Sequence, residues 1–183
     1  MVNSKLLLFN EINSVIQSAS DGLNVKISAD LGVVDLWLAQ NASKNGFDIF
    51  GFRHTIDNYF VKHAFKGHGN KKQESQRGQV AVEEKDIKNL TDIFENPNFI
   101  IYGAKNNIKN DIIIFVKNYS EYSTLFVEEI RKGRKELAGN TIYKMSGTSD
   151  AYTLSRHPTL YARNDTSTIN IIDVNAGNVK VTN

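Results

Sequence analysis

Four segments rich in β-branched and aromatic residues follow Pro97: Phe99-Ile-Ile-Tyr-Gly-Ala104, Ile112-Ile-Ile-Phe-Val-Lys-Asn118, Tyr122-Ser-Thr-Leu-Phe-Val-Glu-Glu-Ile130 and Leu137-Ala-Gly-Asn-Thr-Ile-Tyr-Lys144. Residues of these types favour β-strands. Polar, turn-like stretches separate the segments, at 105–110, 118–121 and 132–135. Because short connections join antiparallel neighbours, the sequence predicts a four-stranded antiparallel meander here.

Apolar residues before Pro97 recur at the three- and four-residue spacing of a helix face. This spacing predicts helices over 4–20, 33–43, 52–66 and 87–94, with short strands at 23–28 and 79–82 and a polar loop at 70–78. Helices followed by strands are typical of an α+β fold, in which the helices pack on one face of the sheet. We therefore expect the other face to be free to carry a site.

Three parts are expected along the chain, the last of which is set off by a composition dense in Ser, Thr, Asn, Asp and Gly. We expect an N-terminal helical segment over 1–45, the main α+β domain over 46–146 and a polar tail over 147–183. Within the tail, 169–174 and 178–182 flank a turn-like Asn175-Ala-Gly-Asn178 and predict a hairpin.

Composition excludes several classes of protein. The 183 residues include no cysteine, which rules out disulfide scaffolds, thiolate nucleophiles and cysteine-ligated metals. The 22 lysines and arginines against 20 acidic residues do not by themselves indicate a nucleic-acid binder, because such proteins show a clustered basic patch. The apolar run near the N-terminus is too short for a signal peptide or a membrane span, so we expect a soluble protein without a membrane partner.

Three of the four histidines lie close together, at His54, His63 and His68. A metal site is not expected, because positions 63 and 68 do not form an i, i+4 pair and no carboxylate stands at a metal-binding spacing. His63 lies near the end of a predicted helix, where the helix dipole favours its protonated form and a role in proton transfer. The alternative is a half-buried histidine that packs in the core.

Two further groups of residues could contact a phosphate. The turn Arg131-Lys-Gly-Arg-Lys135 carries four cations, which could hold a phosphate or simply be solvated and protect a sheet edge. On the last strand, alternation places Thr141 and Tyr143 on one face and Lys144 on the other. Their hydroxyls could bind a phosphate oxygen, or these residues could serve only as strand formers.

Taken together, these groups describe RNA cleavage without a metal or cofactor. That reaction needs a base for the ribose 2′-OH, an acid for the leaving 5′-oxygen and cations around the phosphate.

The order of the motifs is similar to that of a known family. The run from Gly51 to Gly69 contains a His-x4-His-Gly helix end, and it is followed by Arg77-Gly-Gln-Val-Ala-Val82, Asp86-Ile87, Glu95-Asn-Pro-Asn98 and the segment 128–137 leading to Thr141-Ile-Tyr-Lys144. This series resembles the phage-associated barnase–EndoU–colicin E5/D–RelE-like (BECR) nuclease domains of polyvalent phage proteins and polymorphic toxins. The resemblance covers about residues 46–146. It implies an α+β nuclease fold and metal-independent ribonuclease activity, frequently on tRNA.

The resemblance also implies site residues, position by position. The catalytic group would be His63, His68, Arg131, Thr141 and Tyr143, with Lys132 as a further basic residue. To the RNA-binding group with Lys132 we add Arg134 and Lys135 of the basic turn and Lys144 of the last strand, on their charge rather than on the resemblance. The expected product is a 2′,3′-cyclic phosphate.

Expected partners are RNA, an immunity protein or phage structural proteins, and the expected location is the cytoplasm of a bacterial host or target cell, or a phage virion. The alternative is a non-catalytic virion or packaging module that binds nucleic acid or a protein through the same basic surface.

Overall fold

The computed structural model describes residues 4–156, 169–175 and 177–179. Its elements are, in chain order, α1 (Ser4–Ser20), β1 (Ser28–Val33), α2 (Leu36–Lys44), β2 (Arg53–Asp57), α3 (Asn58–His68), α4 (Lys71–Gln76), β3 (Gln79–Val80), α5 (Glu84–Lys88), α6 (Leu90–Glu95), β4 (Phe99–Tyr102), β5 (Ile112–Asn118), β6 (Tyr122–Arg131), a 3₁₀ turn (Lys132–Arg134), β7 (Glu136–Ser146), α7 (Ala151–Ser155), β8 (Asn170–Asp173) and β9 (Gly177–Val179).

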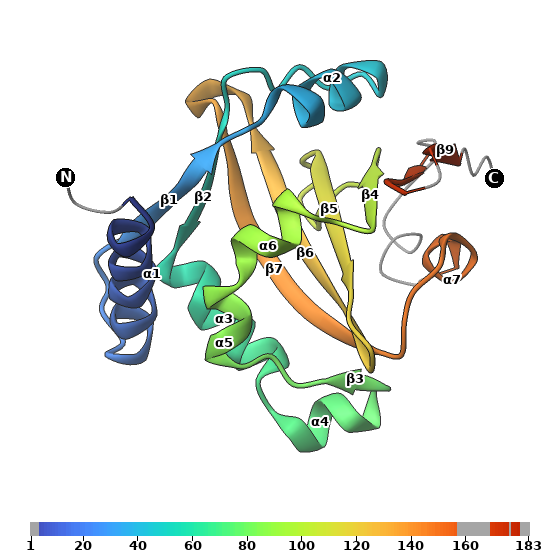
Figure 1. Ribbon diagram of the computed structural model, residues 1–183. Coiled ribbons are helices and arrows are strands. Elements are labelled where there is room, and N and C mark those ends of the chain that lie inside the picture. The colour runs from blue at the N-terminus through green and yellow to red at the C-terminus, as the bar shows by residue number, and fades with distance from the viewer. Residues whose placement is uncertain (1–3, 157–168, 176, 180–183) are drawn as a thin grey trace.

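The predicted meander is present. Strands β4, β5, β6 and β7 lie side by side in that order, and each is antiparallel to the next (Figure 1). Each strand begins and ends within a few residues of its predicted range, because its β-branched and aromatic residues are bounded by turn residues on both sides.

The sheet is larger than the four predicted strands, and it is mixed rather than purely antiparallel. Strands β1 and β2 extend it beyond β7, strands β8 and β9 extend it beyond β4, and β3 pairs with the end of β7. β2 runs parallel to β7, which brings a segment from the first third of the chain against the last strand of the meander. The predicted C-terminal hairpin is confirmed for β8 and β9, while positions 180–182 lie outside the described residues.

The prediction of one helix over 52–66 is wrong in its first part. Residues 53–57 form β2, which pairs with β1 along its length and with β7 through residues 53–55, and α3 starts only at Asn58. The Asp57 side chain accepts a hydrogen bond from the backbone N–H of Phe60 at 2.8 Å and so caps α3. The spacing of the apolar residues led to the wrong element because residues 52, 56 and 60 are four positions apart. This spacing fits both the two-residue period of a strand and the period of a helix, which is close to four.

Other boundaries also differ from the predictions. The loop expected at 70–78 contains α4, whose N-cap Asn70 accepts from two backbone N–H groups. The strand expected at 23–28 begins only at Ser28, and the helix expected over 87–94 is divided into α5 and α6.

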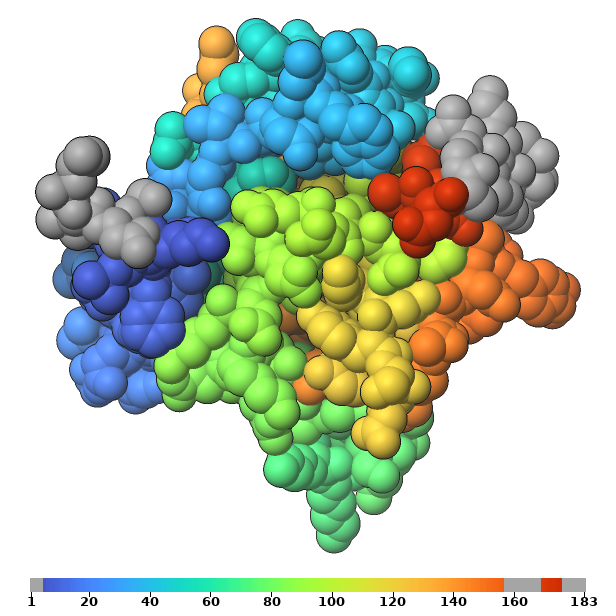
Figure 2. Space-filling view, in the orientation of Figure 1, coloured from blue at the N-terminus to red at the C-terminus, as the bar shows by residue number. Residues whose placement is uncertain are grey.

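Two apolar clusters cover the two faces of the sheet. The larger cluster joins one face to α1, α2, α3, α5 and α6, and in Figure 2 the green segment that contains α5 and α6 lies over the middle of this face. The smaller cluster packs Leu154 of α7 and Ile169 on the opposite face. The opposite face is therefore partly covered, contrary to the expectation that it is free. Residues before 46 share the sheet and the larger cluster through α1, β1 and α2.

Helix α3 occupies an unusual place at the edge of β7. β2 pairs only with residues 136–138 of β7 and β3 only with residues 144–145, and α3 packs against β7 between them. Close approach depends on Gly139, since a Cβ there would lie 3.2 Å from the ring of Phe60 on α3. This contact sets the position of α3 relative to the sheet.

Candidate functional site

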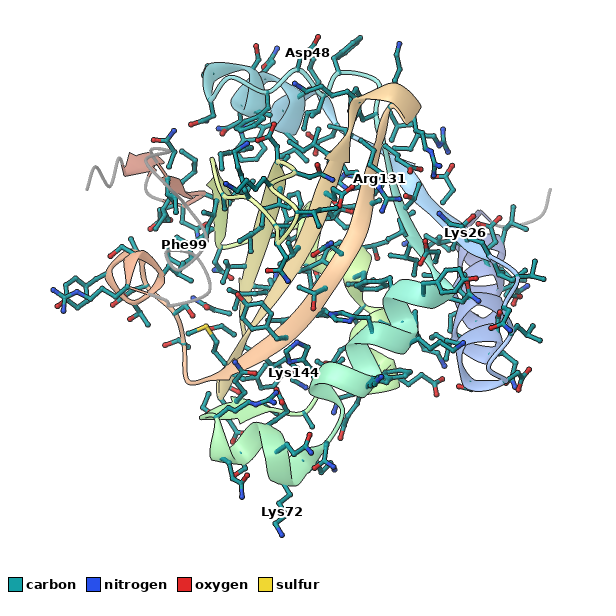
Figure 3. The ribbon with its side chains drawn as sticks, turned by 180° about the vertical axis from the view of Figure 1, so that it is seen from behind. Lys26, Asp48, Lys72, Phe99, Arg131 and Lys144 are labelled. Carbon is teal, nitrogen blue, oxygen red and sulfur yellow. The ribbon has the colours of Figure 1, made fainter. Side chains whose placement is uncertain are left out.

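A pocket of about 390 Å³ opens between α3, strands β6 and β7, and the loop that joins β4 to β5. It lies on the side of the sheet seen in Figure 3, where α3 is in front and Arg131 is labelled on the upper part of the sheet. Its lining residues are Asp57, Tyr59, Phe60, His63, Asn106, Asn107, Ile108, Glu129, Arg131, Gly139 and Asn140. The structure thus brings together His63 and Arg131, two of the predicted site residues.

His63 projects from the exposed side of α3. The helix buries Phe60, Val61 and Ala64 against the sheet and α1, so position 63 remains exposed at the pocket. The alternative of a histidine packed in the core therefore does not apply to His63. An exposed imidazole can exchange protons with a bound molecule.

Arg131 is held in place by two carboxylates. Its Nε lies 3.0 Å from Glu129 Oε1, and its Nη1 lies 3.3 Å from Glu136 Oε1. Burial disfavours the charge, but the hydrogen bonds to both glutamates outweigh it and raise the pKa of the Arg131 guanidinium above its usual value. These contacts use two of the five N–H donors of the guanidinium, which leaves three for another acceptor.

Glu129 is a site residue that the sequence analysis missed. It is 8% exposed, it contacts Arg131 through Oε1, and its Oε2 accepts a hydrogen bond from Asn106 Nδ2 at 2.7 Å. The sequence did contain a signal for including Glu129 in the site, because residues 129 and 131 of one strand point to the same face as each other. The pocket therefore combines an imidazole, a carboxylate and a guanidinium.

His68 and Tyr143 lie further along α3 and β7, outside the residues that line the pocket. The His68 Nδ1 atom is 3.1 Å from Oε2 of the fully buried Glu74, whose Oε1 accepts from Arg77 at 2.8 Å. The His68 ring lies 5.8 Å from the ring of Tyr143. This cluster ties the end of α3 to α4 and β7, and a catalytic role for His68 or Tyr143 stays a prediction.

Thr141 lies opposite Val127 in the register of β6 and β7. Its Oγ1 atom is buried, and no hydrogen bond to it is found among the described residues. Thr141 is not among the residues that line the pocket, so its role as a phosphate ligand also stays a prediction.

Lys144 is in a different environment from the one expected of an RNA-binding lysine. Its side chain is buried, its Nζ lies 2.9 Å from Asp86 Oδ2, and the same atom sits 4.4 Å from the centre of the Tyr122 ring. Figure 3 shows Lys144 at the lower end of the sheet, whereas Arg131 lies on the upper part. Its charge is thus compensated inside the protein.

The predicted basic turn is exposed. Lys132, Arg134 and Lys135 lie at the end of the β6–β7 hairpin, and Arg134 has a long contact of 3.6 Å with Glu136. The backbone of Lys135 has a φ of 51°, the left-handed conformation that closes the turn. These cations are available to a polyanion.

His54 forms an unexpected pair in the core. Its Nδ1 atom lies 2.8 Å from Glu128 Oε2, both side chains are almost fully buried, and its ring stacks on Phe94 with the centroids 4.0 Å apart. Burial raises the pKa of Glu128 even though the neighbouring His54 lowers it. This pair faces the helices and is closed to solvent.

In the described part of the chain, no group of three or more histidine or acidic side chains is arranged to hold a metal ion. No helix within that part is long and apolar enough to cross a membrane.

Helices packed against an antiparallel meander define a small α+β domain, and a histidine, a glutamate and an arginine line one open pocket in it. The chain belongs to the family described as phage-Barnase-EndoU-ColicinE5/D-RelE like nuclease3, whose model matches residues 32–152. This match confirms the resemblance of the motifs and extends it to α2 and the last two residues of β1. A comparison with curated proteins and with solved structures gives no match.

Proposed function

We propose that this protein is an endoribonuclease that cleaves RNA without a metal, by attack of the ribose 2′-OH on the adjacent phosphate. The observation that carries the proposal is the single pocket lined by His63, Glu129 and Arg131. A base, an acid and a cation are the three groups that this reaction requires, and all three come from side chains of the chain itself.

In the proposed mechanism, Glu129 removes the proton from the 2′-OH. The 2′-oxygen then forms a bond to phosphorus, and the bond from phosphorus to the 5′-oxygen breaks. His63, in its protonated form, donates a proton to the leaving 5′-oxygen. The products are a 2′,3′-cyclic phosphate and a free 5′-hydroxyl. Glu129 then releases its proton to solvent and His63 takes one up from solvent, which restores both groups for the next cycle.

The ion pair between Glu129 and Arg131 supports this assignment on electrostatic grounds. Before the reaction, the Glu129 carboxylate compensates the charge of Arg131 at 3.0 Å. When Glu129 becomes protonated, its share of that compensation ends while the contact with Glu136 remains, so more of the positive charge of Arg131 acts on the phosphate as its negative charge increases. Interactions that strengthen only in the transition state are those that accelerate a reaction.

The exposed cations of the β6–β7 turn suit the flanking phosphates of an RNA strand. Lys132, Arg134 and Lys135 project into solvent from the hairpin that also carries Arg131. We propose tRNA as the first substrate to test, and, for a toxin of this family, an acidic immunity protein as the partner that would cover the pocket.

The test is incubation of the purified protein with tRNA and with total RNA in the presence of EDTA, followed by analysis of the cleaved ends. Wild-type protein should give 2′,3′-cyclic phosphate ends. His63→Ala should lower the rate by about 10²- to 10⁴-fold, the usual contribution of a general acid or base, whereas Lys66→Ala on the exposed side of the same helix should not. Cleavage that requires a divalent metal, or an unchanged rate in His63→Ala, would refute the mechanism.

The exposed turn also favours a second candidate, a module that binds nucleic acid without cleaving it. That function predicts salt-sensitive RNA binding with no products on the gel, because affinity then depends on the release of counterions. The same incubation distinguishes the two functions.

A further inference from the structure

The pocket is lined by several residues that the proposed reaction does not use. Beside His63, Glu129 and Arg131, it is lined by two exposed apolar side chains, Tyr59 on the first turn of α3 and Ile108 on the β4–β5 loop. Tyr59 is 45% exposed and Ile108 is 74% exposed. Catalysis at a phosphate needs neither of them.

The β4–β5 loop is built to hold a defined shape. The buried Asn106 side chain accepts hydrogen bonds from the backbone N–H groups of Ile108 and Asn110, at 3.1 and 2.9 Å, and donates one to Glu129. At the base of the loop, Lys105 and Asp111 form an ion pair at 2.6 Å. Ile108 is therefore presented to the pocket by a loop that is anchored to the proposed catalytic carboxylate.

The ring of Tyr59 is held at both ends. Its backbone belongs to α3, and its hydroxyl donates a hydrogen bond to the backbone carbonyl of Asn24 at 2.6 Å. An aromatic ring that is already restrained loses little conformational entropy when a ligand stacks on it. Proteins that bind single-stranded nucleic acids use exposed aromatic side chains in this way.

Two amide side chains complete the wall, those of Asn107 and Asn140. The asparagine amide has one donor and one acceptor group, which match the N6 amino group and N7 atom of adenine. The pocket thus offers apolar surfaces for the faces of a base and an amide for its edge.

We propose that this pocket is also the subsite for the nucleobase next to the scissile phosphate, with Tyr59 and Ile108 as its apolar walls and adenine as its preferred base. The inference rests on the proposed function, because it places the base beside the phosphate held by Arg131.

The test is a titration of the full chain with adenosine 3′-monophosphate, with the corresponding guanosine, cytidine and uridine compounds, and with inorganic phosphate. Adenosine 3′-monophosphate should bind most tightly. Ile108→Ala and Tyr59→Ala should each weaken that binding roughly 5- to 100-fold, in the range found for base-stacking side chains, while Tyr59→Phe should retain most of it. The matched control is Phe50→Ala, which removes an apolar side chain of similar exposure (70%) outside the pocket.

Each outcome has a defined meaning. Binding of all four nucleotides with equal affinity would overturn the preference for adenine, and binding no tighter than that of phosphate would overturn the subsite. In RNA cleavage, Ile108→Ala should raise KM with little change in kcat, and an unchanged KM would also count against the subsite. Nucleotide binding by a protein that does not cleave RNA would instead refute the nuclease mechanism and leave the subsite standing.

Discussion

Replacing the buried Glu128 with glutamine should make the stability of the protein less dependent on pH. Glu128 is 0% exposed, and its Oε2 atom is 2.8 Å from Nδ1 of the equally buried His54. Its other oxygen is buried without a hydrogen-bond partner among the described residues. Burial therefore raises the pKa of Glu128 above its ordinary value of 4.5, although His54 opposes this shift.

The sign of the effect follows from proton binding. Between pH 4.5 and the raised pKa, the folded protein keeps a proton on Glu128 that the unfolded chain has released. The free energy of unfolding then falls as the pH rises through this interval, by at most about 1.4 kcal/mol per pH unit. Glutamine has no proton to release, so Glu128→Gln should match the wild type near pH 4 and be more stable at pH 7, by about 1.4 kcal/mol for each unit of the shift.

Urea unfolding followed by circular dichroism at pH 4, 5.5 and 7 measures this difference, provided that the slope against urea stays the same. Glu121→Gln, at an exposed carboxylate, serves as the control and should follow the wild type at every pH. A loss of about 3–5 kcal/mol at pH 7 in Glu128→Gln would refute the reasoning, because that is the cost of breaking a buried pair whose charges stabilise each other.

Three further predictions concern the pocket and its surroundings. Glu129→Gln should lower the single-turnover rate of RNA cleavage by about 10²- to 10⁴-fold with little change in RNA binding. Gly139→Ala should cost roughly 1–3 kcal/mol in thermal unfolding, because the added Cβ would lie 3.0 Å from Ile56 Cγ2 on β2 and 3.2 Å from the ring of Phe60 on α3 and would push both away from β7. Lys144→Met should destabilise the fold by about 3–5 kcal/mol in urea, because it leaves the carboxylate of Asp86 buried without its partner.

Matched variants separate these effects from general damage. Gly133→Ala, on the open turn where nothing lies within 4 Å of the added Cβ, should be far milder than Gly139→Ala. Lys85→Met removes an exposed lysine and should not reproduce the loss seen in Lys144→Met. If Lys144→Met weakened RNA binding and left stability unchanged, the internal role of its ammonium group would be wrong.

The strands of the meander could be predicted because their signal is local. Each strand is a run of residues that favour a pleated backbone, and each run ends at turn residues. β2 could not be recognised in the same way, since its pairing with β7 joins Arg53 to Glu136 across nearly half of the chain. One local signal was nevertheless available, because an aspartate at position 57 suits the N-cap of a helix that begins directly after it.

The site shows the same division between local and distant information. Alternation along β7 correctly separated Thr141 and Tyr143 from Lys144. His63 lies on a helix as predicted, but its expected place near the helix end is wrong, because α3 continues to His68 and His63 lies in its middle. The partners of these side chains come from elsewhere in the chain, so the buried pair of Lys144 with Asp86 and that of His68 with Glu74 could not be found from spacing.

The position of the pocket follows from the way β7 changes neighbours along its length. After three paired residues, β2 separates from β7, and α3, which follows β2, takes its place beside β7, so a helix rather than a strand lies along this edge. At the same point the pairing of β6 with β7 shifts register between Val127 and Glu128. Such bulges turn neighbouring side chains and are frequent beside active sites.

These two features act together on the chemistry. The register shift between Val127 and Glu128 lies one residue before Glu129 and leaves Asn140 as an extra, unpaired residue of β7, and both Glu129 and Asn140 line the pocket. The helix brings His63 to the same opening, at a distance set by the contact between Gly139 and Phe60. A change that restored regular pairing between β6 and β7, or that extended the pairing of β2 along β7, would therefore remove the pocket without altering any of the residues proposed to react. The site thus originates in the topology of the sheet.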